Sequence, residues 1–118
     1  MQPTNKEISE AFSNGNFKFT YAHLADDIQW NIAGDKILKG KAAVVEFCNK
    51  TAAYFSEVTT RFSMNNMIAD NDCIAIDGTA HFINKENKST HVSSCDVYRF
   101  KGGKLQEITS YCIVTGKE

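Results

Sequence analysis

The sequence predicts an α+β fold, with helices in the first half of the chain and strands in the second. Apolar residues recur at helical spacing as far as about Phe55. From Glu57 onward, apolar and polar residues instead alternate in runs that polar turns separate, as in antiparallel strands. The 118 residues, 42% of them hydrophobic, are enough for one domain with a buried core. We therefore expect a single domain over residues 1–118.

Two short helices are predicted at the N-terminus. Thr4 and Glu7 have the spacing of a capping box, in which each side chain accepts a hydrogen bond from the other residue's backbone amide. Ile8 and Phe12 then share one helical face, and Gly15 suits the left-handed stop. A second helix is expected after Asn16, interrupted at residues 26–27, with an apolar stripe made by Phe17, Thr20, Tyr21 and Leu24.

A strand and the longest helix are predicted next. Apolar residues at 28, 30 and 32 alternate with polar ones, which favours a half-buried strand. A turn at Gly34 and a short apolar segment at residues 37–38 follow. Residues 41–55 form the helix, and its core-facing stripe consists of Val44, Phe47, Cys48, Thr51 and Phe55.

The rest of the chain is predicted to be strands. Residues 58–69 form a long strand whose apolar alternation slips between Met64 and Met67, which indicates a bulge. Residues 73–83 form the next strand, and 84–89 a polar hairpin loop. Two further strands, 92–100 and 105–113, flank Lys101-Gly102-Gly103, where glycine supplies the positive φ of a tight hairpin.

Composition excludes several classes of protein. A net charge of −1 and a pI near 6.3 give no electrostatic footprint for nucleic acid or an anionic membrane. No apolar run approaches the roughly 20 residues of a membrane span. Because no apolar signal region is visible near the N-terminus, we expect a cytoplasmic protein.

The cysteines and histidines suggest neither a metal site nor a cofactor. Four well-separated cysteines, with no C-x-x-C pair, are expected to be buried reduced thiols. The three histidines show no metal-binding spacing.

Asp96 is the most informative residue of the chain. In a strand, successive side chains point to opposite faces, so Asp96 shares its face with Ser94, Tyr98 and Phe100. Burial among apolar side chains would raise the pKa of this carboxyl. It would then suit a pocket-lining acid, the alternative being an aspartate that hydrogen-bonds to Tyr98, Trp30 or a backbone amide.

The same hairpin carries a resemblance to a known family. The sequence Asp96-Val97-Tyr98-Arg99-Phe100, the glycine turn and Gly103-Lys104-Leu105 resemble the last hairpin of the nuclear transport factor 2-like superfamily. This superfamily includes ketosteroid isomerases and SnoaL-like polyketide cyclases. The resemblance implies a cystatin-like cone, a strongly curved mixed sheet wrapped around three N-terminal helices. It also places Asp96 where the isomerases have their oxyanion-hole aspartic acid.

Two departures argue against ketosteroid isomerisation. Aligned through residues 24–27, the general-base aspartate of the isomerases falls on Ile32, and their oxyanion-hole tyrosine falls on about Ile8. Isoleucine can neither move a proton nor polarise a carbonyl. Many superfamily members also carry Tyr-x-Asp near the C-terminal end, where this chain has Tyr111-Cys112-Ile113.

The resemblance and these departures favour a domain that binds a small apolar molecule, with Asp96 as its polar anchor. The residues expected to line the pocket are Ile8, Phe12, Trp30, Ile32, Phe55, Tyr98, Ser110 and Cys112. One alternative is a cofactor-free isomerase, cyclase or dehydratase that uses Asp96 as acid or oxyanion donor. Another is a protein-interaction module.

The convex face of the sheet is expected to be broad and polar, and to mediate a homodimer, as superfamily members often do. Parity along the strands assigns to that face Thr59, Arg61, Thr79, His81, Ser93, Arg99, Glu107 and Thr109.

Overall fold

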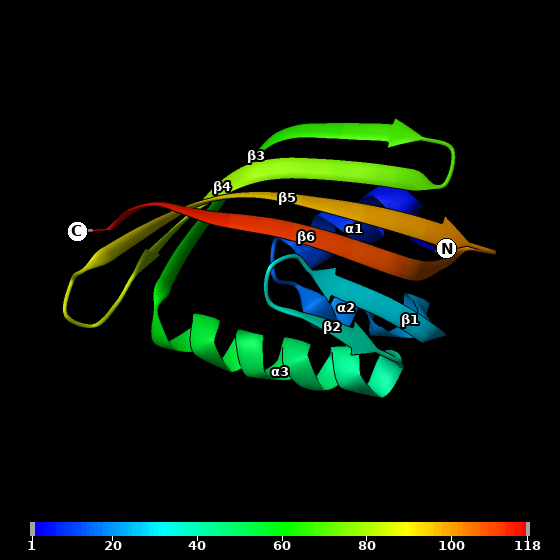
Figure 1. The fold of residues 1–118 in the computed structure, drawn as a ribbon, viewed down its shortest axis with the longest axis horizontal. Helices are drawn as coiled ribbons and strands as arrows, with labels where there is room; N and C mark the ends of the chain where they lie inside the picture. The colour runs from blue at the N-terminus through cyan, green and yellow to red at the C-terminus, as the bar shows by residue number, and fades with distance from the viewer. Residues whose placement is uncertain (1, 118) are drawn as a thin grey trace.

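The computed structural model describes residues 2–117, which form three α-helices, a 3₁₀ helix and six strands (Figure 1). This content confirms the α+β class. In chain order, the elements are α1 (Asn5–Ser13), α2 (Phe17–Thr20), the 3₁₀ helix η1 (Tyr21–His23), β1 (Leu24–Ile32), β2 (Lys36–Lys39), α3 (Lys41–Glu57), β3 (Thr59–Asp70), β4 (Cys73–Ile83), β5 (Ser89–Lys101) and β6 (Lys104–Lys117).

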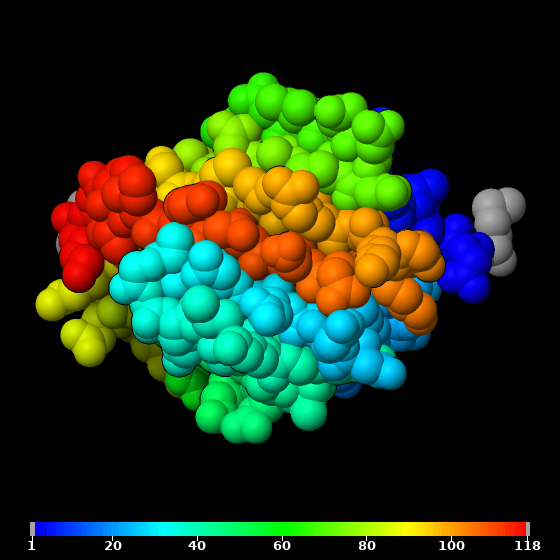
Figure 2. Space-filling model, turned by 45° about the vertical axis from the view of Figure 1, so that its right-hand side comes forward, coloured from blue at the N-terminus to red at the C-terminus, as the bar shows by residue number. Residues whose placement is uncertain are grey.

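The strands form one open, mixed sheet in the order β2-β1-β6-β5-β4-β3. Strands β1 and β6 run parallel, and every other neighbouring pair is antiparallel. The sheet curves around the helices, which confirms the predicted cone (Figure 1). On its outer surface, β5 and β6 lie between the β1–β2 hairpin and the β3–β4 pair (Figure 2).

Local chemistry explains how α1 begins and ends. The Thr4 hydroxyl accepts a hydrogen bond from the Glu7 amide at 3.1 Å, and the Glu7 carboxylate accepts one from the Thr4 amide at 2.9 Å. The predicted capping box is therefore present. Gly15, at φ +84°, lets the chain turn away after the helix, and a Cβ there would lie 3.0 Å from the ring of Phe55.

The prediction for the second helix is wrong beyond Thr20. The chain tightens into η1 after α2, and Leu24 already begins β1, so residues 26–27 lie within a strand. Leu24 pairs with Leu105 across the parallel β1–β6 ladder and is only 2% exposed. This long-range pairing overrides the helical spacing of the local sequence, because burial of Leu24 in the sheet is a tertiary effect that spacing does not encode.

The bulge predicted in β3 is confirmed. The register with β4 shifts between Met64 and Asn66, so Asn65 has no partner in the ladder. The shift lets Met67 pack against the core like Phe62, although an unbroken alternation would put the two side chains on opposite faces.

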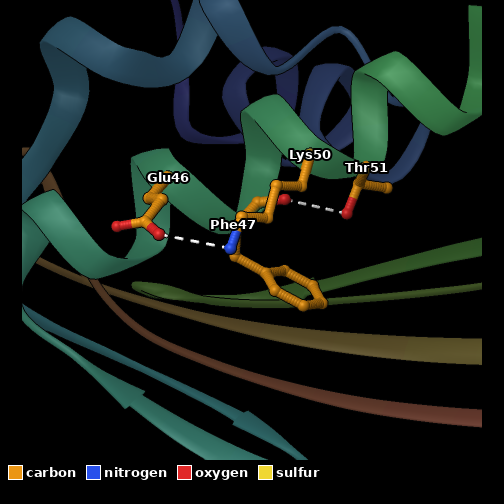
Figure 3. A network of polar contacts seen from close by, with 4 residues as sticks. All are labelled: Glu46, Phe47, Lys50 and Thr51. Atoms are coloured by element: carbon orange, nitrogen blue, oxygen red, sulfur yellow. Dashed lines mark hydrogen bonds and ion pairs between the residues drawn. The ribbon is translucent and has the colours of Figure 1, made fainter.

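Helix α3 packs one side on the sheet and exposes the other. The ring of Phe47 lies edge-on to Trp30 of β1, with the two ring centroids 5.3 Å apart. On the exposed side, Lys50 and Glu46 form an ion pair at 3.2 Å (Figure 3). The half-buried Thr51 donates a hydrogen bond to the Phe47 carbonyl at 2.9 Å. The inner side of α3 thus helps to close the core of the cone.

Candidate functional site

A cavity of about 130 Å³ lies between the concave face of the sheet and the C-terminal ends of α1 and α3. It is lined by Ser13, Asn14, Phe55, Thr60, Phe62, Ala80, Phe82, Val92, Ser94 and Cys112. Side chains from six elements and the segment after α1 therefore enclose it.

Aromatic rings form much of the cavity wall. Phe55 of α3 stacks on Phe82 of β4, with centroids 5.7 Å apart and planes 20° from parallel. The ring centroid of Phe55 also lies 6.3 Å from that of Phe17 in the core, so the cavity wall is continuous with the packed core. Phe55 and Phe82 are partly rather than fully buried, so the wall offers apolar surface to a ligand.

A hydrogen-bonded chain connects the cavity with Asp96. The Ser13 hydroxyl, at the end of α1, donates to Asp96 Oδ2 at 2.9 Å. The same hydroxyl lies 2.5 Å from the Tyr98 hydroxyl. Asp96 and Tyr98 are two residues apart on β5 and hence face the same side of the sheet. Ser13 is therefore the link between the cavity and two buried groups that titrate.

Burial shapes the protonation of both groups. The pKa of Asp96 is raised, chiefly because burial disfavours its anion, while hydrogen bonds from Ser110, Ser13 and Tyr98 act in the opposite direction. The pKa of Tyr98 is raised well above its ordinary value by burial and by the neighbouring Asp96. Tyr98 consequently keeps its proton at neutral pH and can donate to Ser13.

Trp30 supports the network from the neighbouring strands. Its indole N–H donates to the Ser110 hydroxyl at 2.9 Å. Ser110 of β6 is the cross-strand partner of Asp96. Trp30 and Ser110 therefore hold one side of the carboxyl, and Ser13 holds the other.

The structure places the predicted pocket residues in two groups. Phe55 and Cys112 line the cavity. The others lie in or against the packed core behind it: Ile8, Phe12, Trp30, Tyr98 and Ser110 are buried, and Ile32 is partly buried at the end of β1. Ligand contact by these residues stays a prediction.

Sequence reasoning missed Ser13, the residue that joins the cavity to Asp96. One signal pointed to it. Ser9 and Ser13 are four residues apart beside the inward-facing Ile8 and Phe12, and Ser9 is fully buried. Small polar residues along a buried helical stripe require polar partners, which here come from β5 for Ser13.

The thiols of Cys48, Cys95 and Cys112 are poor nucleophiles, because the pKa of each is raised. All four cysteines are free, and Cys48 is buried as predicted, but Cys73 and Cys95 are only half-buried. Cys112 is exposed, so the prediction is wrong there, because this side chain borders the cavity and not the packed core. Burial raises the pKa of Cys48 to about 12, and desolvation and Asp96 raise the pKa of Cys112. Within residues 2–117, no three His, Cys, Asp or Glu side chains cluster as metal ligands. None of the helices there has the length and apolar character needed to cross a membrane.

An open, curved mixed sheet around three helices, with an inner cavity, defines the class of cone-shaped α+β domains. A family model described as SnoaL-like domain matches residues 6–108. The chain therefore belongs to the SnoaL-like domain family of the nuclear transport factor 2-like superfamily, as the final hairpin predicted. Among curated proteins, none matches the sequence.

Solved structures share the fold. An NTF2-like protein of unknown function from Cytophaga hutchinsonii is 39% identical, with a TM-score of 0.84, over 92% of this chain and 95% of that one. A candidate SnoaL-like polyketide cyclase from Jannaschia sp. CCS1 is 9% identical with a TM-score of 0.76, covering 95% and 89%. The epoxide hydrolase/cyclase-like enzyme SalBIII of salinomycin pyran-ring formation is 16% identical with a TM-score of 0.73, covering 96% and 93%. The last two show the fold alone.

Proposed function

We propose that the protein binds a small apolar molecule, about one ring in size, in the cavity at the ends of α1 and α3. An apolar cavity of roughly 150 Å³ is large enough to hold benzene, and the cavity here has about 130 Å³. The aromatic wall would supply the contact surface, and the hydroxyls of Ser13, Thr60 and Ser94 the polar contacts.

The observation that carries this proposal is the position of Ser13. Its hydroxyl borders the cavity and is hydrogen-bonded to Asp96. Asp96 would therefore anchor the ligand through Ser13. A neutral Asp96 could donate to Ser13 and free the serine proton for a carbonyl of the ligand, whereas an ionised Asp96 would leave Ser13 to accept from a hydroxyl.

An isomerase, cyclase or dehydratase that uses Asp96 as proton donor is the alternative, and the raised pKa of Asp96 favours it. Such chemistry also needs a base. The residues that line the cavity include no carboxylate and no imidazole, and the pKa of the Cys112 thiol is raised. This lining supports binding over catalysis.

The test is a titration with phenol and with cyclohexanone, which have similar size but opposite hydrogen-bonding roles. We expect saturable amide NMR shifts around Phe82, Ser94 and Cys112. Ser94→Leu fills the cavity and should abolish them, while Ser93→Leu, on the opposite face of the same strand, should not. Equal responses in the two variants would contradict the proposal.

Carboxyl NMR then tests whether Asp96 takes part in ligand binding. The pKa of Asp96, assigned with Asp96→Asn, should lie above the ordinary value of about 3.9 and move when the cavity is filled. An Asp96 signal that the bound ligand leaves unchanged would remove Asp96 from the site.

We also propose a cytoplasmic homodimer that forms through the apolar part of the convex face, around Ile68, Tyr111 and Ile113, and leaves the polar part around Arg61 open. Three exposed apolar side chains support that interface: Ile68, Tyr111 and Ile113 are 67%, 51% and 65% exposed. Sedimentation should show a dimer that Ile113→Lys weakens. A monomeric wild-type protein would instead favour the view that this face contacts a different protein.

A further inference from the structure

A second hollow, of about 540 Å³, lies on the sheet toward the β4–β5 hairpin. It is lined by Arg61, Ser63, Thr79, Ala80, His81, His91, Val92, Thr115 and Gly116. Ala80 and Val92 also border the inner cavity, so the sheet itself separates the two spaces. The polar side chains belong to the convex face, which the proposed ligand site does not use.

The strand register assembles the polar groups into rows. Arg61 of β3 is opposite His81 of β4, and His81 is opposite His91 of β5. In the next row on the same face, Ser63 is opposite Thr79. Adjacent strands lie about 4.8 Å apart. A guanidinium, two imidazoles and two hydroxyls therefore share a small area of the surface.

The two histidines are held in a fixed arrangement. Their rings stack with centroids 4.2 Å apart and planes 17° from parallel. The Nε2 atom of His81 is 2.9 Å from the Ser89 hydroxyl, which fixes that ring further. The pair therefore forms a flat wall beside Arg61 without needing a ligand to order it.

Gly116 leaves space beside this wall. It is the cross-strand partner of His91, and a Cβ added there would come no closer than 3.8 Å to the His91 ring. A larger side chain at this position would project into the hollow, so the glycine helps to keep it open.

The charged and polar groups that line the hollow indicate which kind of ligand it could bind. The side chain of Arg61 makes no ion pair and no hydrogen bond with another residue in the part of the chain that the structure describes, residues 2–117. Among the described residues 2–117, those that line the hollow include no carboxylate, although the chain as a whole has a net charge of −1. Guanidinium and hydroxyl groups donate hydrogen bonds that phosphate and carboxylate oxygens accept.

From these contacts we propose that the convex face carries a second site, for the oxyanion group of a small molecule, with Arg61 as its principal contact. The shared chemistry is that of a phosphate ester or a carboxylate. Such a site would give the protein a polar ligand in addition to the apolar one of the inner cavity.

The test is amide NMR of the full chain titrated with sodium phosphate, sodium acetate or sodium chloride at equal ionic strength. We expect saturable shifts at Thr79, His81 and His91 with phosphate or acetate, and none with chloride. Saturation by phosphate alone identifies a phosphate ester as the ligand class, and saturation by acetate extends it to carboxylates. Saturation by neither overturns the proposal.

Three variants test whether the anion binds in the hollow. Arg61→Gln should weaken binding by about tenfold, because a charge-assisted contact is lost. Arg99→Gln removes the same charge from the same face outside the hollow and should leave affinity unchanged. Gly116→Val should block binding while preserving the dispersion of the spectrum. Equal weakening in the two arginine variants would mean non-specific charge attraction and would overturn the site.

Discussion

The packed core around Phe12 and the cavity beside Phe55 are both built from aromatic rings, yet they differ in how fully those rings are buried. Phe12 contacts Phe17, Trp30 and Tyr98 at centroid distances of 5.0, 5.0 and 5.9 Å, and all four residues are buried. The rings of Phe55 and Phe82 also contact each other, stacked with centroids 5.7 Å apart, but both stay partly exposed beside the cavity.

This contrast divides the concave surface into a packed part and a part that leaves a cavity. In the core, rings from α1, α2, β1 and β5 close on one another and stabilise the fold. At the cavity, Ala80 and Ser94 are too small to fill the space that the end of α3 covers. Side-chain volume, rather than hydrophobicity, therefore decides where the concave surface closes and where it leaves a cavity.

The strongest test of the comparison is a pair of truncations. Phe12→Ala should reduce the free energy of unfolding by roughly 3–5 kcal/mol, as expected for a buried phenylalanine. Phe55→Ala should cost less than half as much, because this ring is already partly exposed. Chemical denaturation monitored by Trp30 fluorescence measures both. Equal losses would mean that the cavity wall is as tightly packed as the core.

Substitutions at Gly78 and Gly116 test how tightly the sheet is packed near the cavity. A Cβ at Gly78 would lie 2.4 Å from the Ser63 carbonyl and 2.9 Å from the Phe62 ring, so Gly78→Ala should destabilise by about 1–3 kcal/mol. Gly116→Ala meets only ordinary contacts and should be nearly neutral. Thermal melts of the two variants provide the measurement, and a neutral Gly78→Ala would show that β3 can move away.

The pH dependence of stability tests the boundary between the two regions, where Asp96 lies. Because its pKa is higher in the folded state than in the unfolded chain, the folded state binds more protons between the two values. The stabilisation is complete below about pH 3.9 and is lost as the pH rises through the folded pKa. Asp96→Asn should flatten this part of the stability profile. A wild-type profile that rises across the same interval would contradict the raised pKa.

The smallest effect is expected on the exposed side of α3. The Glu46–Lys50 pair is well exposed, so Glu46→Ala should change the free energy of unfolding by no more than about 0.5 kcal/mol. Urea denaturation at low and high salt would reveal the change. A loss above about 1 kcal/mol would show that this side of the helix supports more of the fold than its exposure indicates.

Much of the fold was predictable because its signals are local. The capping box, the bulge in β3 and the glycine hairpin each depend on a few neighbouring residues. The start of β1 was not predictable in this way, since Leu24 joins the strand by pairing with the distant Leu105. Local spacing cannot encode a partner that is distant in the sequence.

The site was predictable only in part, for the same reason. The alternation of side chains along β5 placed Asp96 and Tyr98 on the same face of the sheet. The apolar neighbours on that face indicated that burial would raise the pKa of the Asp96 carboxyl. The role of Ser13 depends on how α1 crosses β5, and the cavity depends on which of many concave side chains are small. Neither follows from periodicity.

The parallel pairing of β1 with β6 has a consequence for synthesis of the chain. A ribosome makes β1 well before its partner β6, because α3 and four other strands separate them in the sequence. The β1–β2, β3–β4, β4–β5 and β5–β6 hairpins can each form from nearby residues, but the other edge of β1 must wait for a distant contact with β6. During translation, the backbone groups on that edge of β1 therefore face water until β6 has been made.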